Sequence, residues 1–137
     1  MRVGTPAVLQ LAALDAAMDI WDTVDMAALR ARSIELSDLF IAEVSRRSPM
    51  LKLVSPTDAK VSGSHVSFAF HEGYAAMQAV IERGVVGDFR APDIMRFGIT
   101  PLFIDEADIV RAAEAIEEVM AGDLWDQPHY KVRAAVT

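Results

Sequence analysis

Two short stretches of the chain, residues 64–70 and 94–100, alternate between apolar positions and small or polar positions. Successive side chains of a β-strand point to opposite faces of the sheet, so each stretch is expected to have one apolar face. The apolar positions are Val66, Phe68 and Phe70 in the first stretch and Met95, Phe97 and Ile99 in the second. The pattern therefore predicts a sheet with one buried face and one face of small and polar residues.

Longer stretches repeat apolar residues with the period of an α-helix. They are residues 7–21, 26–47, 72–83 and 105–122. Thr5 and Pro6 suit the start of the first helix, and Asp25 suits the N-cap of the second. Asp105 and Asp108 predict a capping box for the last helix. The expected apolar stripe of the second helix consists of Met26, Leu29, Leu36, Phe40 and Val44.

The order of these elements predicts the fold class. Further strands are expected at residues 50–54 and just before the Ala91-Pro92 turn, which gives the order helix, helix, strand, strand, helix, strand, strand, helix. We expect an α+β fold, with a small antiparallel or mixed sheet, helices packed on one face, and a long apolar helix before it. Residues 123–137 show no clear period and are expected to form an irregular tail.

The first helix is apolar on most of its circumference. Between residues 8 and 21 only Gln10, Asp15 and Asp19 are polar. An apolar surface of this extent exceeds what one small domain can cover. We therefore expect the helix to contact a partner, either a further domain or another copy of the chain.

The composition excludes several classes of partner. A formal net charge of −7 argues against binding to nucleic acid and to anionic membranes. The chain has no cysteine, so it offers no disulfide, thiol nucleophile or thiolate metal site. It has neither an apolar run of transmembrane length nor a signal-peptide pattern, so a cytoplasmic protein is expected.

The residue types that carry catalysis do not form a complete set. The histidines are His65, His71 and His129. They lack the spacing of metal ligands on a shared element, so no metal site is expected. The lysines Lys52, Lys60 and Lys131 lie in polar or strand-edge contexts, and none is expected to be a buried lysine that forms a Schiff base. No phosphate-binding loop or dinucleotide-binding glycine motif is present in the sequence.

Arg96 is the strongest candidate for ligand binding. It lies in the middle of the second alternating stretch, on the polar face, and Gly98 leaves room for a ligand beside it. A charge in mid-strand is rarely left without a partner. One interpretation is an exposed arginine whose aliphatic stem covers apolar neighbours. The other is a guanidinium that binds a carboxylate in a cleft.

Several blocks of the sequence match one known family. They are Gly4-Thr5-Pro6, residues 24–30, 36–40 and 63–68, and residues 83–98 followed by Pro101-Leu102. The specific parts are Arg90-Ala91-Pro92 and Arg96-Phe97-Gly98. On these blocks the chain resembles the C-terminal part of kynureninases, from residue 2 to about residue 128.

The resemblance implies a pyridoxal-phosphate enzyme of the aspartate-aminotransferase fold. Such enzymes hydrolyse L-kynurenine to anthranilate and L-alanine in tryptophan catabolism, and a homodimer is expected. The family's proteins are longer than this chain, with a large domain that carries the cofactor lysine. By this comparison residues 1–22 are the connecting helix from the large domain, and residues 23–137 are the C-terminal small domain. Pyridoxal phosphate is expected in the intact enzyme and not on this chain alone.

Two residues take family roles by their positions. Arg96 matches the arginine that holds the α-carboxylate of the substrate. Thr5 matches a position that reaches the cofactor phosphate of the neighbouring subunit in related enzymes, and a plain N-cap remains the alternative. Arg90 is expected to brace the turn through Asp88 or Asp93. No catalytic residue is expected on the chain.

Three functions remain open. The chain is a piece of a kynureninase that is inactive alone, or a stand-alone interaction protein, or a binder of small carboxylates through Arg96. The interaction protein would pair with itself or with a full-length enzyme through residues 7–21.

Overall fold

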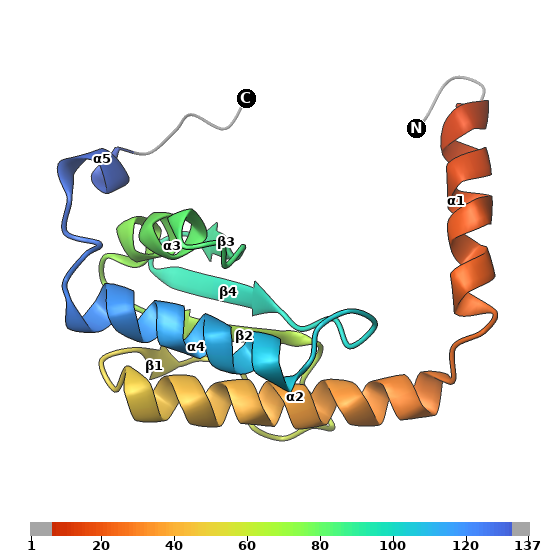
Figure 1. Ribbon diagram of the computed structural model, residues 1–137, viewed down its shortest axis with the longest axis horizontal. Coiled ribbons are helices and arrows are strands. Elements are labelled where there is room, and N and C mark those ends of the chain that lie inside the picture. Colours follow the sequence, from red (N-terminus) through yellow and green to blue (C-terminus); the bar gives the residue numbers. More distant parts are fainter. Residues whose placement is uncertain (1–6, 133–137) are drawn as a thin grey trace.

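The computed structural model describes residues 7–132, which form one small sheet with helices packed on it and a separate helix at the start (Figure 1). The elements are α1 (Val8–Trp21), α2 (Met26–Arg47), β1 (Lys52–Leu53), β2 (His65–Ala69), α3 (Gly73–Glu82), β3 (Asp88–Arg90), β4 (Ile94–Gly98), α4 (Glu106–Ala121) and α5 (Pro128–Lys131). The order predicted from the sequence is confirmed, with one addition. Helix α5 forms where an irregular tail was predicted, with Pro128 in its first turn, where proline suits a helix.

The four strands form one antiparallel sheet in the order β1-β2-β4-β3. Where β2 pairs with β4, Val66 lies opposite Phe97 and Phe68 lies opposite Met95. All of these side chains are buried, so the apolar face predicted from alternation is confirmed. Strand β1 is shorter than the predicted 50–54, because a turn closed by a hydrogen bond from Leu51 N–H to the Ser48 carbonyl precedes it.

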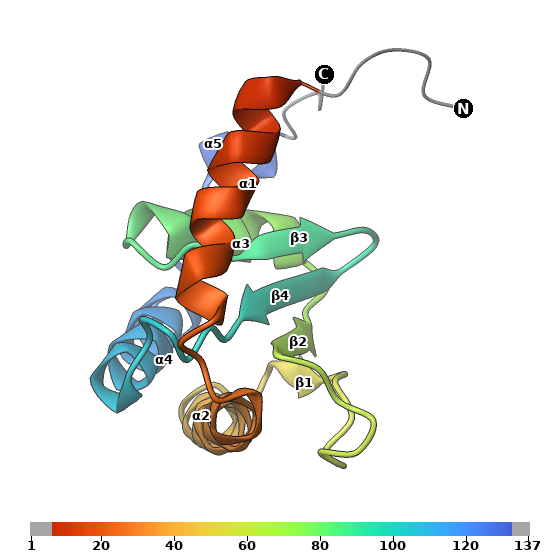
Figure 2. The same ribbon diagram turned by 90° about the vertical axis from the view of Figure 1, so that its right-hand side faces the viewer.

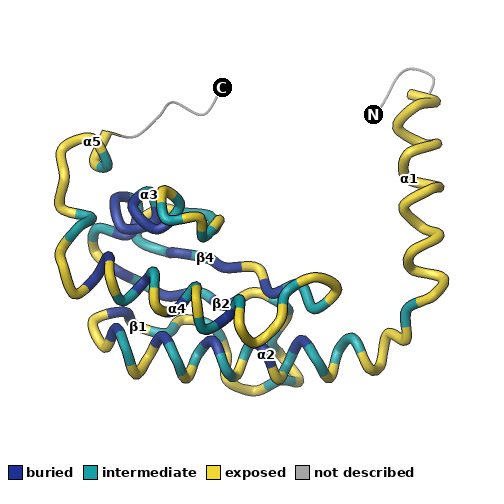
Figure 3. The backbone as a smooth tube through the Cα atoms, viewed as in Figure 1, coloured by how far each residue is buried: buried dark blue, intermediate teal, exposed yellow. Residues whose placement is uncertain are grey.

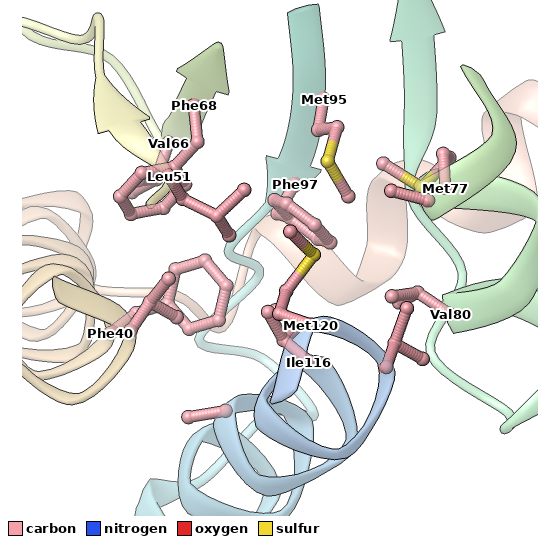
Figure 4. Packing of buried hydrophobic residues seen from close by; sticks show 14 of the residues in the cluster. Phe40, Leu51, Val66, Phe68, Met77, Val80, Met95, Phe97, Ile116 and Met120 are labelled. Carbon is pink, nitrogen blue, oxygen red and sulfur yellow. The ribbon is translucent and has the colours of Figure 1, made fainter. Parts of the chain in front are cut away.

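Helices α2, α3 and α4 cover one face of the sheet and leave the other face open (Figure 2). Between the two layers, the ring of Phe40 on α2 makes edge contacts with Phe68 and Phe97, at centroid distances of 6.1 and 5.3 Å. Helices α3 and α4 add Met77, Val80, Ile116 and Met120 to the same cluster (Figure 4). The predicted α+β class, with helices on one face of a small sheet, is confirmed.

Capping residues fix the starts of α2 and α4 where the sequence predicts them. Oδ1 of Asp25 accepts hydrogen bonds from the backbone N–H groups of Ala27 and Ala28 at 2.8 and 3.2 Å. Asp105 and Asp108 form the reciprocal capping box of α4. Both caps satisfy N–H groups that the first turn of a helix leaves unpaired.

The buried stripe of α2 begins later than predicted. Met26 is 59% exposed, because the first turns of α2 extend past the sheet (Figure 1). Ser33 is buried in the stripe instead, and its Oγ lies 2.7 Å from Oγ of Ser64. Between Leu29 and Leu36 the predicted stripe contains no apolar residue. The buried, hydrogen-bonded Ser33 fills this position of the stripe.

Helix α1 stands apart from the rest of the chain and is exposed along its whole length (Figure 3). Its exposed large apolar side chains are Val8, Leu9, Leu11, Leu14, Met18, Ile20 and Trp21. The N-cap is Ala7, so the helix begins later than the predicted start at Thr5 and Pro6, and these two lie outside the described residues. No helix within the described residues has both the length and the apolarity to cross a bilayer.

Ion pairs join α2 to α4 at the surface. Arg47 pairs with Glu43 of its own helix at 2.8 Å and with Glu117 of α4 at 2.6 Å. Arg32 pairs with Glu106 of α4 at 2.5 Å. The hydrogen bond from Arg47 is the main reason why the pKa of Glu43 is lowered.

Phe40→Ala should strongly destabilise the chain, because Phe40 is 1% exposed and contacts two other rings. Truncating a buried phenylalanine costs ~3–5 kcal/mol of unfolding free energy. Phe103→Ala is the matched control: Phe103 is 77% exposed, and the cost should stay within about 0.5 kcal/mol. Denaturant unfolding followed by circular dichroism measures both variants. Equal losses would contradict the placement of Phe40.

The ion pair of Glu43 should make stability depend on pH. Its pKa is lower in the folded chain than in the unfolded chain, so its contribution is present above the unfolded pKa of about 4.3 and is lost as pH falls through the folded value. Arg47→Gln should therefore flatten the fall in Tm on acidification. Lys60→Gln, which removes the same charge from an exposed loop, should leave the slope unchanged. Identical slopes for the two variants would count against this role of Arg47.

Candidate functional site

Arg96 lies on the open face of the sheet, in a row of side chains that crosses three strands. In the sheet register, Arg96 of β4 lies opposite Asp88 of β3 on one side and opposite Ser67 of β2 on the other. Opposite residues of neighbouring antiparallel strands point to the same face. The side chains of Asp88, Arg96 and Ser67 therefore stand next to one another, and we call these three residues the central row.

Arg96 is paired with a carboxylate of its own chain. Its Nη2 donates a hydrogen bond to Oδ2 of Asp88 at 2.5 Å. The side chain of Arg96 is 34% exposed and that of Asp88 is 45% exposed. The same Asp88 oxygen lies 3.0 Å from Nη2 of Arg90, so Arg90 contacts one of the two partners predicted for it. The carboxylate of Asp88 thus forms ion pairs with two guanidinium groups.

Further rows flank the central row on the open face. By register they contain Lys52, Ala69, Ile94 and Arg90 on one side, and His65 and Gly98 on the other. A Cβ added at Gly98 would meet only a ring carbon of His65, at 3.9 Å, so the space beside Arg96 is open. By register this face carries Lys52, Arg90 and Arg96 against the one carboxylate of Asp88. This local excess of positive charge favours an anion, although the chain is acidic overall.

The hairpin that carries the arginine is held at its turn by the start of α3. The turn contains a cis peptide bond between Ala91 and Pro92. The carbonyl of Asp93 accepts a hydrogen bond from the backbone N–H of Phe70 at 3.0 Å. A Cβ at Gly73 would come within 2.6 Å of that carbonyl oxygen, so glycine is required for this close approach. The turn is therefore hydrogen-bonded to the segment between β2 and α3 and lies close against the start of α3.

The described residues do not fit a cofactor lysine or a metal ion. Lys52 and Lys60 are exposed. Lys131 pairs with Asp126, which raises its pKa, whereas a lysine that forms a Schiff base needs a lowered pKa. Within residues 7–132, no three histidine, aspartate or glutamate side chains gather as ligands for a metal ion.

The side chain of Arg96 is only partly buried by this chain. A hollow of about 480 Å³ lies between α4 and the end of β4, but Arg96 is not part of its lining. An exposed ion pair contributes only about 0–1 kcal/mol, because water screens it. A carboxylate bound to Arg96 by this chain alone would be held weakly, so a tight site needs cover from another part of a larger protein.

Of the two predicted site residues, one lies within the described part of the chain. Arg96 lies on the polar strand face where alternation predicts it, and Thr5 lies outside the described residues. Alternation along the strand does not predict the pairing of Arg96 with Asp88. The spacing around the turn carries that signal, because residues 88 and 96 are equally far from the centre of the hairpin.

Comparison with known proteins identifies relatives of the whole chain. Residues 29–116 match the family described as the kynureninase C-terminal domain. The chain is 43% identical to the kynureninase of Pseudomonas fluorescens and 39% identical to that of Burkholderia mallei (strain SAVP1), over 98% of this chain and 33% of each relative. It therefore spans about a third of the length of these curated relatives.

The fold is also found among solved structures. One is a glycine decarboxylase (P-protein) of the glycine cleavage system in inhibitor-bound form, with a TM-score of 0.66 over 87% of this chain and 28% of that chain. The sequence identity is 24%, so the likeness shows the fold alone.

Proposed function

This chain belongs to the family of kynureninase C-terminal domains, and we propose that it is the C-terminal part of an enzyme that hydrolyses L-kynurenine to anthranilate and L-alanine. The observation that carries the proposal is the guanidinium of Arg96, presented from the middle of β4 on the open face of the sheet. The substrate is an amino acid, and its α-carboxylate is the kind of group that a guanidinium recognises in a two-pronged way.

In this proposal Arg96 binds and orients the substrate. Two parallel hydrogen bonds from a planar guanidinium fix the direction of the carboxylate, and with it the direction of the bond that is to be broken. Correct orientation lowers the barrier because a misplaced substrate must first reach a reactive geometry. The central strand of a sheet is a suitable support, since β4 is hydrogen-bonded to strands on both sides.

Pyridoxal phosphate, when bound in the intact enzyme, supplies the electron sink for cleavage of the side chain. We propose that its lysine belongs to the part of the enzyme outside this chain, because the described lysines are exposed or have a raised pKa. Thr5 is proposed to approach the cofactor phosphate of a neighbouring subunit, as a hydroxyl near a helix start suits a phosphate. The chain alone is then inactive, and the intact enzyme is a cytoplasmic homo-oligomer.

Arg96→Ala should lower kcat/KM for L-kynurenine in a chimera in which this chain replaces the matching third of the Pseudomonas fluorescens kynureninase. The change leaves the substrate carboxylate partly desolvated and unpaired, which costs ~2–5 kcal/mol. That corresponds to roughly thirtyfold to several thousandfold in kcat/KM. The absorbance of the bound cofactor should not change, because Arg96 is proposed to contact only the substrate.

Two further variants sharpen this test. Arg96→Lys should recover little activity, because an ammonium group cannot reproduce the planar fork. Arg90→Ala is the matched control, since Arg90 pairs with the same Asp88 oxygen and is 62% exposed. It should cost at most ~1 kcal/mol of stability and leave kcat/KM close to that of the parent chimera. Near-normal kcat/KM for Arg96→Ala, with a large loss for Arg90→Ala, would mean that the two arginines have the opposite roles.

Helix α1 favours a second candidate function, that of a stand-alone interaction protein. None of its residues is buried, and Val8 and Leu9 are 72% and 86% exposed. An apolar surface of this size favours association. In the intact enzyme the rest of the protein is proposed to cover α1, whereas in a stand-alone protein a second copy covers it, and pairing of identical surfaces produces a symmetric dimer.

The 137-residue chain should self-associate through α1 when it is studied alone. Sedimentation velocity at ~50 μM should show species larger than a monomer, because a dissociation constant in the micromolar range is reached by modest apolar burial. Leu14→Glu should shift the distribution towards the monomer. Val61→Glu, at a loop residue that is 69% exposed, is the matched control and should not shift it. A sharp monomer for the unmodified chain would rule out this mode of association.

A further inference from the structure

We propose that Asp88 is a positioning residue for Arg96, and that the hydroxyl of Ser67 is a second donor to the carboxylate that Arg96 binds. The role of Ser67 rests on the proposed function. The contact between Asp88 and Arg96 is present in the structure of this chain, so the role of Asp88 can be tested independently of the proposed function.

Asp88 fixes one end of a long and flexible side chain. Its Oδ2 accepts a hydrogen bond from Nη2 of Arg96 at 2.5 Å, and its contact with the more exposed Arg90 is longer, at 3.0 Å. A guanidinium has five N–H donors, and no other side-chain hydrogen bond of Arg96 occurs among the described residues. The remaining donors are therefore available to a ligand while the position of the group is already set.

Ser67 lies on the other side of Arg96 from Asp88. Its backbone is fixed in two places, since its N–H donates to Oγ of Ser55 at 2.9 Å and its carbonyl accepts from the N–H of Val54 at 2.9 Å. Its hydroxyl, in contrast, has no hydrogen-bond partner in the part of the chain that the structure describes. A free hydroxyl on a fixed backbone beside a guanidinium is a suitable second donor to a carboxylate.

The charge of Asp88 also determines on which side of Arg96 a ligand binds. Two carboxylates on the same side would repel each other, so a bound anion is favoured on the side away from β3. That side carries Ser67 in the same row and Gly98 two residues along β4, where the surface is open. The central row thus offers one defined place for a carboxylate, between Arg96 and Ser67.

Nuclear magnetic resonance of the arginine side chains in the 137-residue chain tests the role of Asp88. Rotation of the Arg96 guanidinium should be slower than that of an unpaired arginine, and Asp88→Asn should make it fast. Asp88→Glu, which keeps the charge, should retain part of the slowing. Glu35→Gln is the matched control, because Glu35 pairs with Arg32 on α2 at 3.3 Å, and it should not affect Arg96. Free rotation of Arg96 in the unmodified chain would overturn the positioning role.

Kinetics of the chimera with L-kynurenine test the carboxylate site. Asp88→Asn and Ser67→Ala should each raise KM about tenfold with a smaller change in kcat, as one hydrogen bond to a charged group is lost or misplaced. Ser67→Thr keeps a hydroxyl and should leave KM close to that of the parent chimera. Neither Asp88→Asn nor Ser67→Ala should add to the effect of Arg96→Ala. A large effect of Arg96→Ala with no effect of the other two would overturn this inference and leave the proposed function standing. No effect of Arg96→Ala would overturn the proposed function and the role of Ser67 together, while the resonance experiment decides on Asp88 separately.

Discussion

The pairing of β2 with β4 in one register is the constraint on which both the core and the candidate site depend. It places Val66 against Phe97 and Phe68 against Met95 in the core, and on the opposite face it places Ser67 against Arg96. Because strand side chains alternate, a slip of β4 by one residue would turn Arg96 to the buried face and Phe97 to the open face. The apolar packing that stabilises the sheet therefore also fixes where the guanidinium stands.

Among the described residues, two surfaces have no other part of the chain packed on them, and both are suited to contact with another part of a protein. The open face of the sheet carries a local excess of cationic side chains, and α1 exposes apolar residues along its length. A small domain normally buries such an apolar surface or uses it to associate. Since the chain spans about a third of the length of its curated relatives, the remainder of such a protein would be large enough to cover both.

Patterns local in sequence predicted most of the fold. The alternation around Phe68 and Phe97 and the caps at Asp25 and Asp105 depend only on near neighbours, and the structure reproduces them. The prediction that Met26 is buried is wrong, because Met26 lies beyond the end of the sheet. The periodicity of a helix does not show where the sheet beneath it ends.

The candidate site could be predicted only in part, because it depends on residues that meet through folding. Arg96 followed from its strand position and from the family resemblance, but its pairing with Asp88 depends on the length of the hairpin. The role proposed for Thr5 concerns a neighbouring subunit, and no pattern within one chain can test such a contact. The residue type and the strand period identify Arg96 as an unusual charge in mid-strand. Its partners, in contrast, are set by the register of neighbouring strands and by contacts with other chains or domains.

A crystal structure of the chimeric enzyme with the product L-alanine bound tests the central claim most directly. The account predicts that the alanine carboxylate lies within about 2.7–3.1 Å of the guanidinium nitrogens of Arg96, on the side of Ser67, while Asp88 keeps its contact on the other side. A carboxylate held by another cation, with Arg96 still facing solvent, would contradict the account.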